Sequence, residues 1–312
     1  MSRNKIAVVF PGQGSQRSGM GKDFYENIAV SRETYEEASQ ALGWSVTNLC
    51  LGDDEKINLT EYAQPCILAT EIAMYRGLQF LYGFAPDYFG GHSLGEYTAL
   101  VAADTMPFAE ALKTVHARGQ LMQKATPPGT GSMAAVIGKG LDADMVRNTL
   151  KELPIDVANI NSADQIVISG RADSMEIAQE RLMQAAANED SLRFVQLNVS
   201  APFHSRFMDT IKDSFMTILN SISAKLNPDN ADRVTSNFTG GFHSNNTANI
   251  IERLVSQLSN SVNWHENMEI LAKKSDQIFE IGPNRPLRHF FRSIEVECHS
   301  ITTFSAAKRV FA

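Results

Sequence analysis

A serine flanked by glycines is the residue of this chain best suited to nucleophilic chemistry. It lies in Gly91-x-Ser93-x-Gly95, the spacing of a nucleophile elbow, in which a serine occupies a sharp turn between a strand and a helix. Glycines flank such a serine because the turn leaves no room for a side chain on either side. The helix that follows directs its unpaired N–H groups at the place where an oxyanion would form. The spacing predicts a nucleophilic serine, with a glycine-rich turn and an exposed serine as the alternative.

The serine needs a base, because its hydroxyl is a weak nucleophile until its proton is removed. His92 adjoins Ser93 on the turn and should point elsewhere, so we expect it to shape the elbow or to contact substrate. His204 lies in the segment Ser200-Ala201-Pro202-Phe203-His204-Ser205, where the chain is expected to return from a small lobe to a larger one. Spacing favours His204 as the base, and a core or capping role stays open. Of the others, His116, His243 and His265 lie in segments typical of surface or ordinary helix, and His289 and His299 come late in the chain.

A helical arginine is a further candidate. Arg118 lies in a predicted helix at 107–125, where most arginines face solvent. The next residue, Gly119, is a poor helix former and indicates that something passes close to the backbone there.

The elements around these residues predict an α/β fold. Between 132 and 198 the order is β-α-β-β-α-β, the ferredoxin-like pattern, and the Pro/Gly-rich stretch 127–131 precedes it. We therefore expect a small ferredoxin-like lobe, residues 132–198, inserted into a large α/β-hydrolase-like lobe of residues 1–131 and 199–312 with a mostly parallel sheet covered on both faces. Predicted strands are 5–10, 86–89, 133–138, 155–159, 165–170, 193–199, 233–237 and 276–281; predicted helices are 31–42, 61–82, 97–103, 107–125, 142–151, 173–187, 206–222, 247–258, 264–273 and 286–293.

Composition restricts the class of protein. The 312 residues are 43% hydrophobic and 20% charged, with a formal net charge of −7, which argues against a nucleic-acid-binding surface. The three cysteines, Cys50, Cys66 and Cys298, are far apart and fit buried thiols in a reducing compartment better than disulfides or a zinc site. No apolar run approaches the roughly 18 residues of a membrane span, and 6–10 is too short for a signal peptide. We expect a cytoplasmic protein without membrane attachment.

Five motifs, taken in order, resemble the malonyl-CoA:acyl carrier protein transacylases and the acyltransferases of polyketide synthases. The likeness runs from about residue 5 to about residue 294, and five ordered motifs are far more specific than one elbow. They are Phe10-Pro11-Gly12-Gln13-Gly14-Ser15-Gln16, Gly91-His92-Ser93-Leu94-Gly95-Glu96, Ala117-Arg118-Gly119-x-Leu121-Met122, Asn159-x-Asn161-Ser162 with Val167-Ile168-Ser169-Gly170, and Ser205-Arg206-Phe207-Met208 after His204.

The resemblance implies a role for each matching position. Ser93 would be the nucleophile, His204 its base, and Arg118 the clamp for the free carboxylate of a malonyl group. Three main-chain groups complete the implied site: the N–H groups of Gln13 and Leu94 as the oxyanion hole, and the carbonyl of Gln257 as the group that orients the histidine in place of an aspartate.

The implied activity is transfer of a malonyl group from malonyl-CoA, through an acyl-serine, to the phosphopantetheine thiol of an acyl carrier protein in polyketide or fatty-acid biosynthesis. No metal or redox cofactor is needed, and we expect a monomer. The segment Ser205–Met208 looks more like the polyketide-serving type. One alternative is a hydrolase that removes acyl groups from carriers. Arg118 argues against this alternative, because a monocarboxylic acyl chain has no free carboxylate for the guanidinium to bind. A non-catalytic carrier-binding protein is the other.

A cluster of basic residues late in the chain is a candidate docking patch. Arg285, Arg288, His289 and Arg292 fall within eight residues, after a predicted strand end at Gly282. Carrier proteins of this type are usually acidic, and so is this chain, so docking requires a local surface of opposite sign. A solvated helix face is the alternative interpretation.

Overall fold

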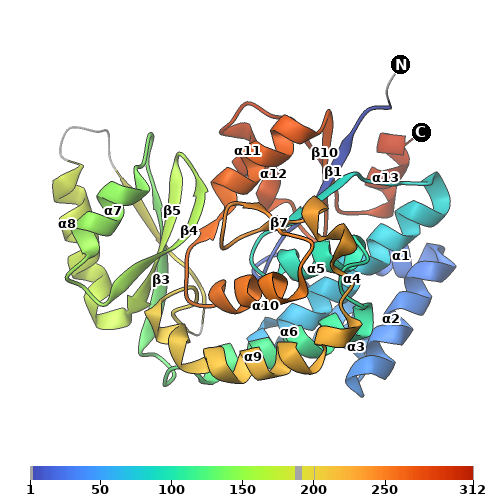
Figure 1. Cartoon of the computed structure of the whole chain (residues 1–312), viewed down its shortest axis with the longest axis horizontal. Coiled ribbons are helices and arrows are strands. Elements are labelled where there is room, and N and C mark those ends of the chain that lie inside the picture. Colours follow the sequence, from blue (N-terminus) through green and yellow to red (C-terminus); the bar gives the residue numbers. More distant parts are fainter. Residues whose placement is uncertain (1–2, 187–191, 200, 312) are drawn as a thin grey trace.

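The computed structural model describes residues 3–186, 192–199 and 201–311 of the chain. Within these residues the strands form a four-stranded sheet, a five-stranded sheet and a two-stranded ribbon, and helices pack around the two larger sheets (Figure 1). This is the mixed α/β architecture that the sequence predicts. In the same ranges, no helix combines the length and the apolar character that crossing a membrane requires.

The four-stranded sheet is parallel throughout, which confirms the predicted parallel sheet. Its order is β11-β10-β1-β2, so the strand nearest the N-terminus lies inside the sheet. The carboxyl ends of β1 and β2 meet at one edge, where Phe10 is in register with Gly91. The strands are β1 (Ile6–Phe10), β2 (Tyr88–Gly91), β10 (Gln277–Ile281) and β11 (Cys298–Ile301).

Successive residues of β1 enter hydrophobic cores on opposite faces of this sheet. Val8 and Phe10 join the larger core, while Ala7 and Val9 join a second core around Trp264. This alternation follows from the two-residue repeat of a strand. The sheet is therefore covered on both faces, as expected for a parallel sheet.

The predicted helices are observed with small shifts in their ends. The predicted helix 206–222 instead begins as a 3-10 turn, which is followed by α9 (Lys212–Ser221). The predicted strand 233–237 shortens to β7 (Thr235–Ser236), which pairs with β8 (Gly241–Phe242). The helices around the parallel sheet are α1 (Lys22–Asn27), α2 (Ala29–Leu42), α3 (Val46–Leu51), α4 (Thr60–Tyr82), α5 (Gly95–Ala102), α6 (Phe108–Lys124), α9 (Lys212–Ser221), α10 (Thr247–Ser256), α11 (Trp264–Lys274), α12 (Pro286–Arg292) and α13 (Phe304–Phe311), with 3-10 turns at 55–58, 206–211, 223–225 and 228–233.

The five-stranded sheet confirms the predicted β-α-β-β-α-β order. Its order is β6-β3-β5-β4-β9, of which the first four strands are antiparallel and come from the predicted small lobe. The fifth, β9 (Val262–Asn263), comes from much later in the chain and pairs in parallel with β4, which the sequence does not predict. The elements are β3 (Gly131–Ile137), α7 (Ala143–Leu150), β4 (Ile155–Ser162), β5 (Gln165–Arg171), a 3-10 turn at 172–174, α8 (Met175–Ala185) and β6 (Arg193–Gln196).

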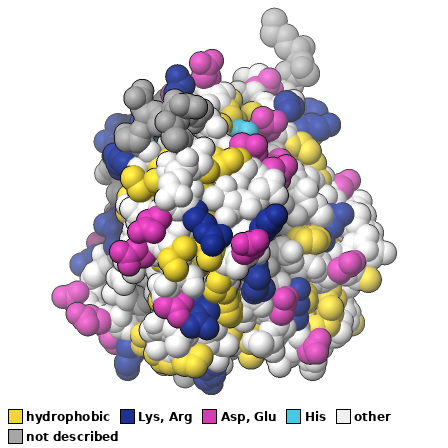
Figure 2. Space-filling view, turned by 90° about the vertical axis from the view of Figure 1, so that its left-hand side faces the viewer, with side chains coloured by type: hydrophobic (Ala, Val, Ile, Leu, Met, Phe, Trp, Pro, Cys, Tyr) yellow, Lys and Arg dark blue, Asp and Glu magenta, His cyan; other side chains and the backbone are white. Residues whose placement is uncertain are grey.

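The small sheet has a hydrophobic core of its own, which includes Val136, Val146, Ile166 and Leu182. The boundaries 132–198 stay a prediction. Residues 187–191 of that range, including the last residue of the predicted helix 173–187, lie outside the described residues, as does residue 200 of the His204 segment. Figure 2 views the molecule from the left-hand side of Figure 1, the side of α7, α8 and the small sheet. It shows acidic and basic side chains interspersed among scattered apolar ones.

Candidate active site

The predicted nucleophile elbow is present. β2 ends at Gly91, α5 begins at Gly95, and Ser93 between them has a φ of 52°, in the left-handed region that side chains other than glycine rarely adopt. A Cβ on Gly91 would lie 2.0 Å from the carbonyl of Gly95, and one on Gly95 would lie 2.1 Å from the carbonyl oxygen of Phe10. Both glycines are therefore required by close backbone approaches, and the strain at Ser93 is held in place by the packing around it.

The structure brings His204 to the serine. Its Nε2 lies 2.7 Å from Ser93 Oγ, and its Nδ1 lies 2.8 Å from the main-chain carbonyl oxygen of Gln257. Because a carbonyl can only accept, Nδ1 carries a proton that it donates to Gln257, which leaves Nε2 to accept from the serine hydroxyl. Burial and the nearby charge of Arg118 lower the pKa of His204 to about 3. The imidazole is therefore neutral at neutral pH, and its unprotonated Nε2 faces the serine hydroxyl.

A buried guanidinium faces the same serine. Arg118, only 1% exposed, donates from Nη2 to Ser93 Oγ at 3.2 Å and to Gln257 Oε1 at 2.8 Å. Its Nη1 donates to Gln64 Oε1 at 2.9 Å, and its Cζ lies 5.4 Å from the ring centre of Tyr97. Among the described residues, its Nε has no acceptor. Burial lowers the pKa of Arg118, but an arginine retains its charge in such a site. The arrangement can bind an anionic group beside the serine.

Two side chains bond to the main chain of Ser93, one to its N–H and the other to its carbonyl. Asn237 accepts from the Ser93 N–H at 2.5 Å and donates to the carbonyl of Gly91 at 2.8 Å. Gln257 Nε2 donates to the Ser93 carbonyl at 3.0 Å and to Glu96 Oε2 at 2.7 Å. These long-range bonds are not among the predictions made from the sequence. One signal was available, since Glu96 is the only charged residue in the otherwise apolar or small run 94–103.

The other histidines near the elbow have structural partners. His92 Nε2 lies 2.8 Å from Oδ1 of Asn161, and within the described residues its side chain has no hydrogen bond to Ser93. The expectation that His243 lies in a surface segment is wrong: it is buried, and its Nε2 lies 2.8 Å from Glu96 Oε1. Its segment approaches the elbow because the His243 N–H bonds the carbonyl of Val234 beside the parallel sheet.

The two main-chain groups implied as an oxyanion hole lie on segments that meet at the elbow. A Cβ on Gly12 would lie 2.5 Å from the carbonyl oxygen of His92, so the loop before Gln13 packs directly on the turn before Leu94. Within the described ranges, the N–H groups of Gln13 and Leu94 donate to no protein acceptor. The side chain of Gln13 is anchored separately, by a 3.1 Å bond to Thr60 Oγ1. Both N–H groups therefore lack a protein acceptor in the described part of the chain, with Gln13 half-buried and Leu94 buried, and their role as an oxyanion hole stays a prediction.

The predicted close approach at Gly119 is also present. A Cβ there would lie 2.7 Å from the Cα of Glu61 and from the carbonyl oxygen of Thr60. Helix α6 therefore packs directly against the first turn of α4. This contact fixes the depth at which Arg118, the preceding residue, enters the site.

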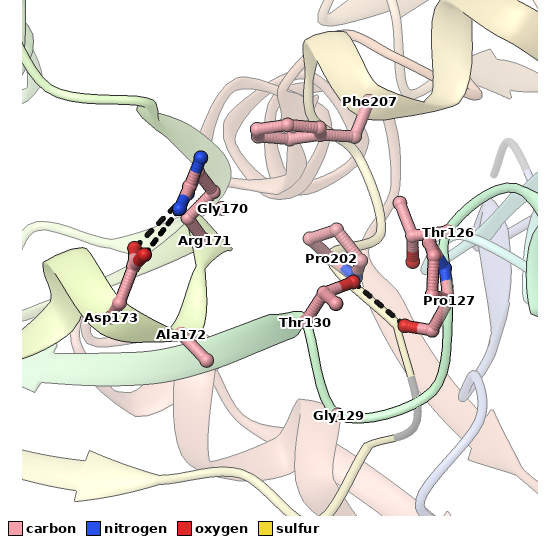
Figure 3. Close-up of a pocket in the computed structure, with 10 residues that line it drawn as sticks. All are labelled: Thr126, Pro127, Gly129, Thr130, Gly170, Arg171, Ala172, Asp173, Pro202 and Phe207. Atoms are coloured by element: carbon pink, nitrogen blue, oxygen red, sulfur yellow. Dashed lines mark hydrogen bonds and ion pairs between the residues drawn. The ribbon is translucent and has the colours of Figure 1, made fainter.

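A pocket of about 460 Å³ lies where the chain passes between the two sheets, and it does not contain the serine (Figure 3). Phe207 and Pro202 give it an apolar wall, and its one drawn ion pair joins Arg171 to Asp173. No nucleophile with a base lines it, so it is not a candidate active site. It is lined by Thr126, Pro127, Gly129, Thr130, Gly170, Arg171, Ala172, Asp173, Pro202 and Phe207. Elsewhere in the described residues, no group of three or more His, Cys, Asp or Glu side chains is arranged to hold a metal ion, and the expectation of no cofactor stays a prediction.

The basic cluster predicted as a docking patch lies on and just before α12. Arg285, His289 and Arg292 are exposed, and Arg288 is half-buried. The start of the helix is held by Glu280, which accepts from the N–H groups of Leu287 and Arg288 at 2.8 and 3.0 Å.

Comparison with known proteins identifies the relatives of this chain. Residues 7–284 match the acyl transferase domain family. The malonyl CoA-acyl carrier protein transacylase of Bacillus subtilis (strain 168) is 36% identical over 299 residues, covering 93% of this chain and 90% of the relative. The crystal structure of malonyl CoA-acyl carrier protein transacylase from Clostridium perfringens Atcc 13124 superposes with a TM-score of 0.90 at 33% identity, covering 98% of this chain and 96% of that one. A malonyl-transacylase solved in complex with its type II PKS acyl-carrier protein gives a TM-score of 0.88 at 33% identity, covering 98% and 99%.

Proposed function

This chain belongs to the malonyl CoA-acyl carrier protein transacylase family, and we propose that it moves a malonyl group from malonyl-CoA to the phosphopantetheine thiol of an acyl carrier protein. One observation carries the proposal: a neutral histidine and a buried guanidinium both contact the hydroxyl of the same serine. The first group supplies a base, and the second supplies a partner for the free carboxylate of the acyl group.

The loading half-reaction follows from this geometry. His204 Nε2 takes the proton of Ser93 Oγ as the oxygen attacks the thioester carbonyl of malonyl-CoA. The resulting oxyanion accepts hydrogen bonds from the N–H groups of Gln13 and Leu94, each of which can be worth roughly 3–4 kcal/mol. The carbon–sulfur bond then breaks, and the leaving thiolate takes the proton from His204. The carbonyl of Gln257 keeps the imidazole oriented in both steps.

The second half-reaction is the first in reverse. The thiol of the carrier's phosphopantetheine gives its proton to His204 and attacks the ester carbonyl, and Ser93 leaves and recovers its proton. Arg118 binds the malonyl carboxylate throughout, because the three-carbon acyl group ends within reach of a guanidinium that lies 3.2 Å from Oγ. A monocarboxylic chain would leave that buried charge without a partner, which disfavours a general acyl hydrolase.

We further propose that the acidic carrier docks on the basic residues on and just before α12, of which Arg285, His289 and Arg292 are exposed. The polyketide-serving type, the monomeric state and the cytoplasmic location stay predictions.

Intact-mass measurement of the protein after exposure to a mixture of acyl-CoAs tests the proposal. The wild type should gain one malonyl group and Ser93→Ala none, while His204→Ala should load about 10²–10⁴-fold more slowly, the range of a general base. Labelling that survives in Ser93→Ala would contradict the assignment of the nucleophile. Rapid release of free acid in the absence of carrier would instead identify a hydrolase.

A further inference from the structure

A fully buried carboxylate lies one side chain away from Arg118 and takes no part in the proposed proton transfers. Glu96, 0% exposed, accepts from Gln257 Nε2 at 2.7 Å, and the same amide presents its Oε1 to Arg118 at 2.8 Å. We propose that Glu96 is a positioning residue for substrate selection, which holds Arg118 in its carboxylate-binding position through the side-chain amide of Gln257. The proposal rests on the proposed function, since it concerns how malonyl is preferred.

The hydrogen bonds of Gln257 determine the orientation of its amide. An amide nitrogen has two protons, and here one goes to Glu96 Oε2 and the other to the carbonyl of Ser93. With both donors taken by acceptors on α5 and its preceding turn, the oxygen must face Arg118. If the amide turned over, two N–H donors would face each other at that position. The acceptor on Glu96 therefore fixes which end of the amide meets the guanidinium.

Glu96 itself is held by further donors. The main-chain N–H of Asn237 donates to Oε2 at 2.9 Å, and His243 Nε2 lies 2.8 Å from Oε1. Since a carboxylate only accepts, His243 donates from Nε2. These hydrogen bonds compensate for the burial of the Glu96 carboxylate. They also hold the carboxylate in the position from which it accepts from Gln257.

The side-chain amide of Gln257 lies between Glu96 and Arg118 and so separates the carboxylate from the guanidinium. The three side-chain oxygens that accept from Arg118, those of Ser93, Gln64 and Gln257, are neutral, so among the described residues no carboxylate contacts the guanidinium directly. A carboxylate in direct contact would compete with the malonyl carboxylate for the same donors. Placing Glu96 behind Gln257 keeps a negative charge near the buried cation, where it favours the charged form of Arg118, and leaves the cation to the substrate.

The test is the ratio of kcat/KM for malonyl-CoA to that for acetyl-CoA, measured as acyl-enzyme formation. Glu96→Met removes the acceptor at similar length and should lower this ratio about 10- to 100-fold, the size of one hydrogen bond to a charged group. Any disturbance of Ser93 lowers both rates alike, so the ratio isolates Arg118. Glu96→Gln keeps an acceptor oxygen for Gln257 and should restore most of the ratio. Gln257→Met should lower it as Glu96→Met does, and the double variant should add little, because both act on one link.

Glu71→Gln is the matched control. Glu71 is also fully buried and contacts α5, through Thr98 Oγ1 at 2.6 Å, but it has no bond to Gln257. Its pKa is raised by burial, so the neutral glutamine is a mild change, and the ratio should stay at the wild-type value. If Glu96→Met does not fold, Glu96→Asp, which draws the carboxylate back from Gln257, should lower the ratio in the same direction. An unchanged ratio in the folded Glu96 variant overturns the inference, while a wild type without malonyl preference overturns the proposed function instead.

Discussion

Replacement of Arg118 by alanine separates malonyl transfer from general acyl chemistry. In the wild type the guanidinium can bind a carboxylate through two charge-assisted hydrogen bonds, each worth about 1.5–3 kcal/mol. Two such bonds correspond to a malonyl-over-acetyl preference on the order of 10²–10⁴-fold, because each 1.4 kcal/mol is a factor of ten. Arg118→Ala should lose that preference, with malonyl loading falling steeply and acetyl loading gaining relative to it.

The assay is kcat/KM for acyl-enzyme formation from malonyl-CoA and acetyl-CoA, with release of free acid followed in parallel. Arg118→Lys is the matched control, because it keeps a positive charge but lacks the planar fork, and it should give an intermediate preference. The alanine variant leaves the side-chain oxygens of Gln64 and Gln257 without this donor, so its thermal unfolding must be measured as well. A wild type that prefers acetyl, or an alanine variant that keeps the malonyl preference while folded, refutes the role of Arg118.

Four further predictions concern carrier docking, the histidine base and the packing of α6. Charge reversal at Arg288 and Arg292 should weaken transfer to the carrier and reduce the salt dependence of transfer, while loading from malonyl-CoA stays unchanged. The control variant Arg32→Glu on α2 should leave both rates unchanged. Unchanged carrier kinetics in the Arg288 and Arg292 variant would show that these residues take no part in docking. Burial and Arg118 lower the pKa of His204 to about 3, so kcat/KM for loading should not change between pH 8 and 5 through protonation of His204. A fall in kcat/KM near pH 6.5 that disappears in a His204 variant would contradict this. An unfolded histidine titrates near pH 6.5, so this group should make the free energy of unfolding fall as the pH drops from about 6.5 towards 3, a slope that a His204→Gln comparison measures. Gly119→Ala adds a Cβ 2.7 Å from backbone atoms of α4 and should cost about 1–3 kcal/mol of stability by denaturant unfolding, whereas an unchanged midpoint would show that the helices separate easily.

The parts of the site that local chemistry determines could be predicted from the sequence. The turn around Ser93 can be recognised in the sequence because its glycines are required by close backbone contacts. These contacts are made within a few residues of the serine or with the neighbouring strand. Gly119 indicated a close approach for the same reason: a missing Cβ shows directly in the sequence. The alternation of strands and helices likewise predicted the parallel sheet and the ferredoxin-like order.

The parts that depend on distant pairs of polar residues could not be predicted in this way. His243 and Glu96 are 147 residues apart, and Gln257 and Glu96 are 161 apart. Glu96, His243 and Gln257 are polar residues of kinds that usually lie at the surface, and only the fold shows that all three are buried. The same holds for β9, a two-residue strand too short for any periodicity, which joins the small sheet only because the chain passes beside β4.

The carbonyl that accepts from His204 suits a site that also holds a cation. An aspartate is the usual third member of a serine–histidine pair, where it stabilises the imidazolium. In this site, a carboxylate at the position of the Gln257 carbonyl would lie close to the Ser93–His204–Arg118 cluster and would attract the guanidinium away from the substrate. A neutral carbonyl fixes the same tautomer without that competition. The full negative charge lies one amide further away, at Glu96, so in the proposed mechanism the orientation of the base and the binding of the acyl carboxylate do not depend on the same group.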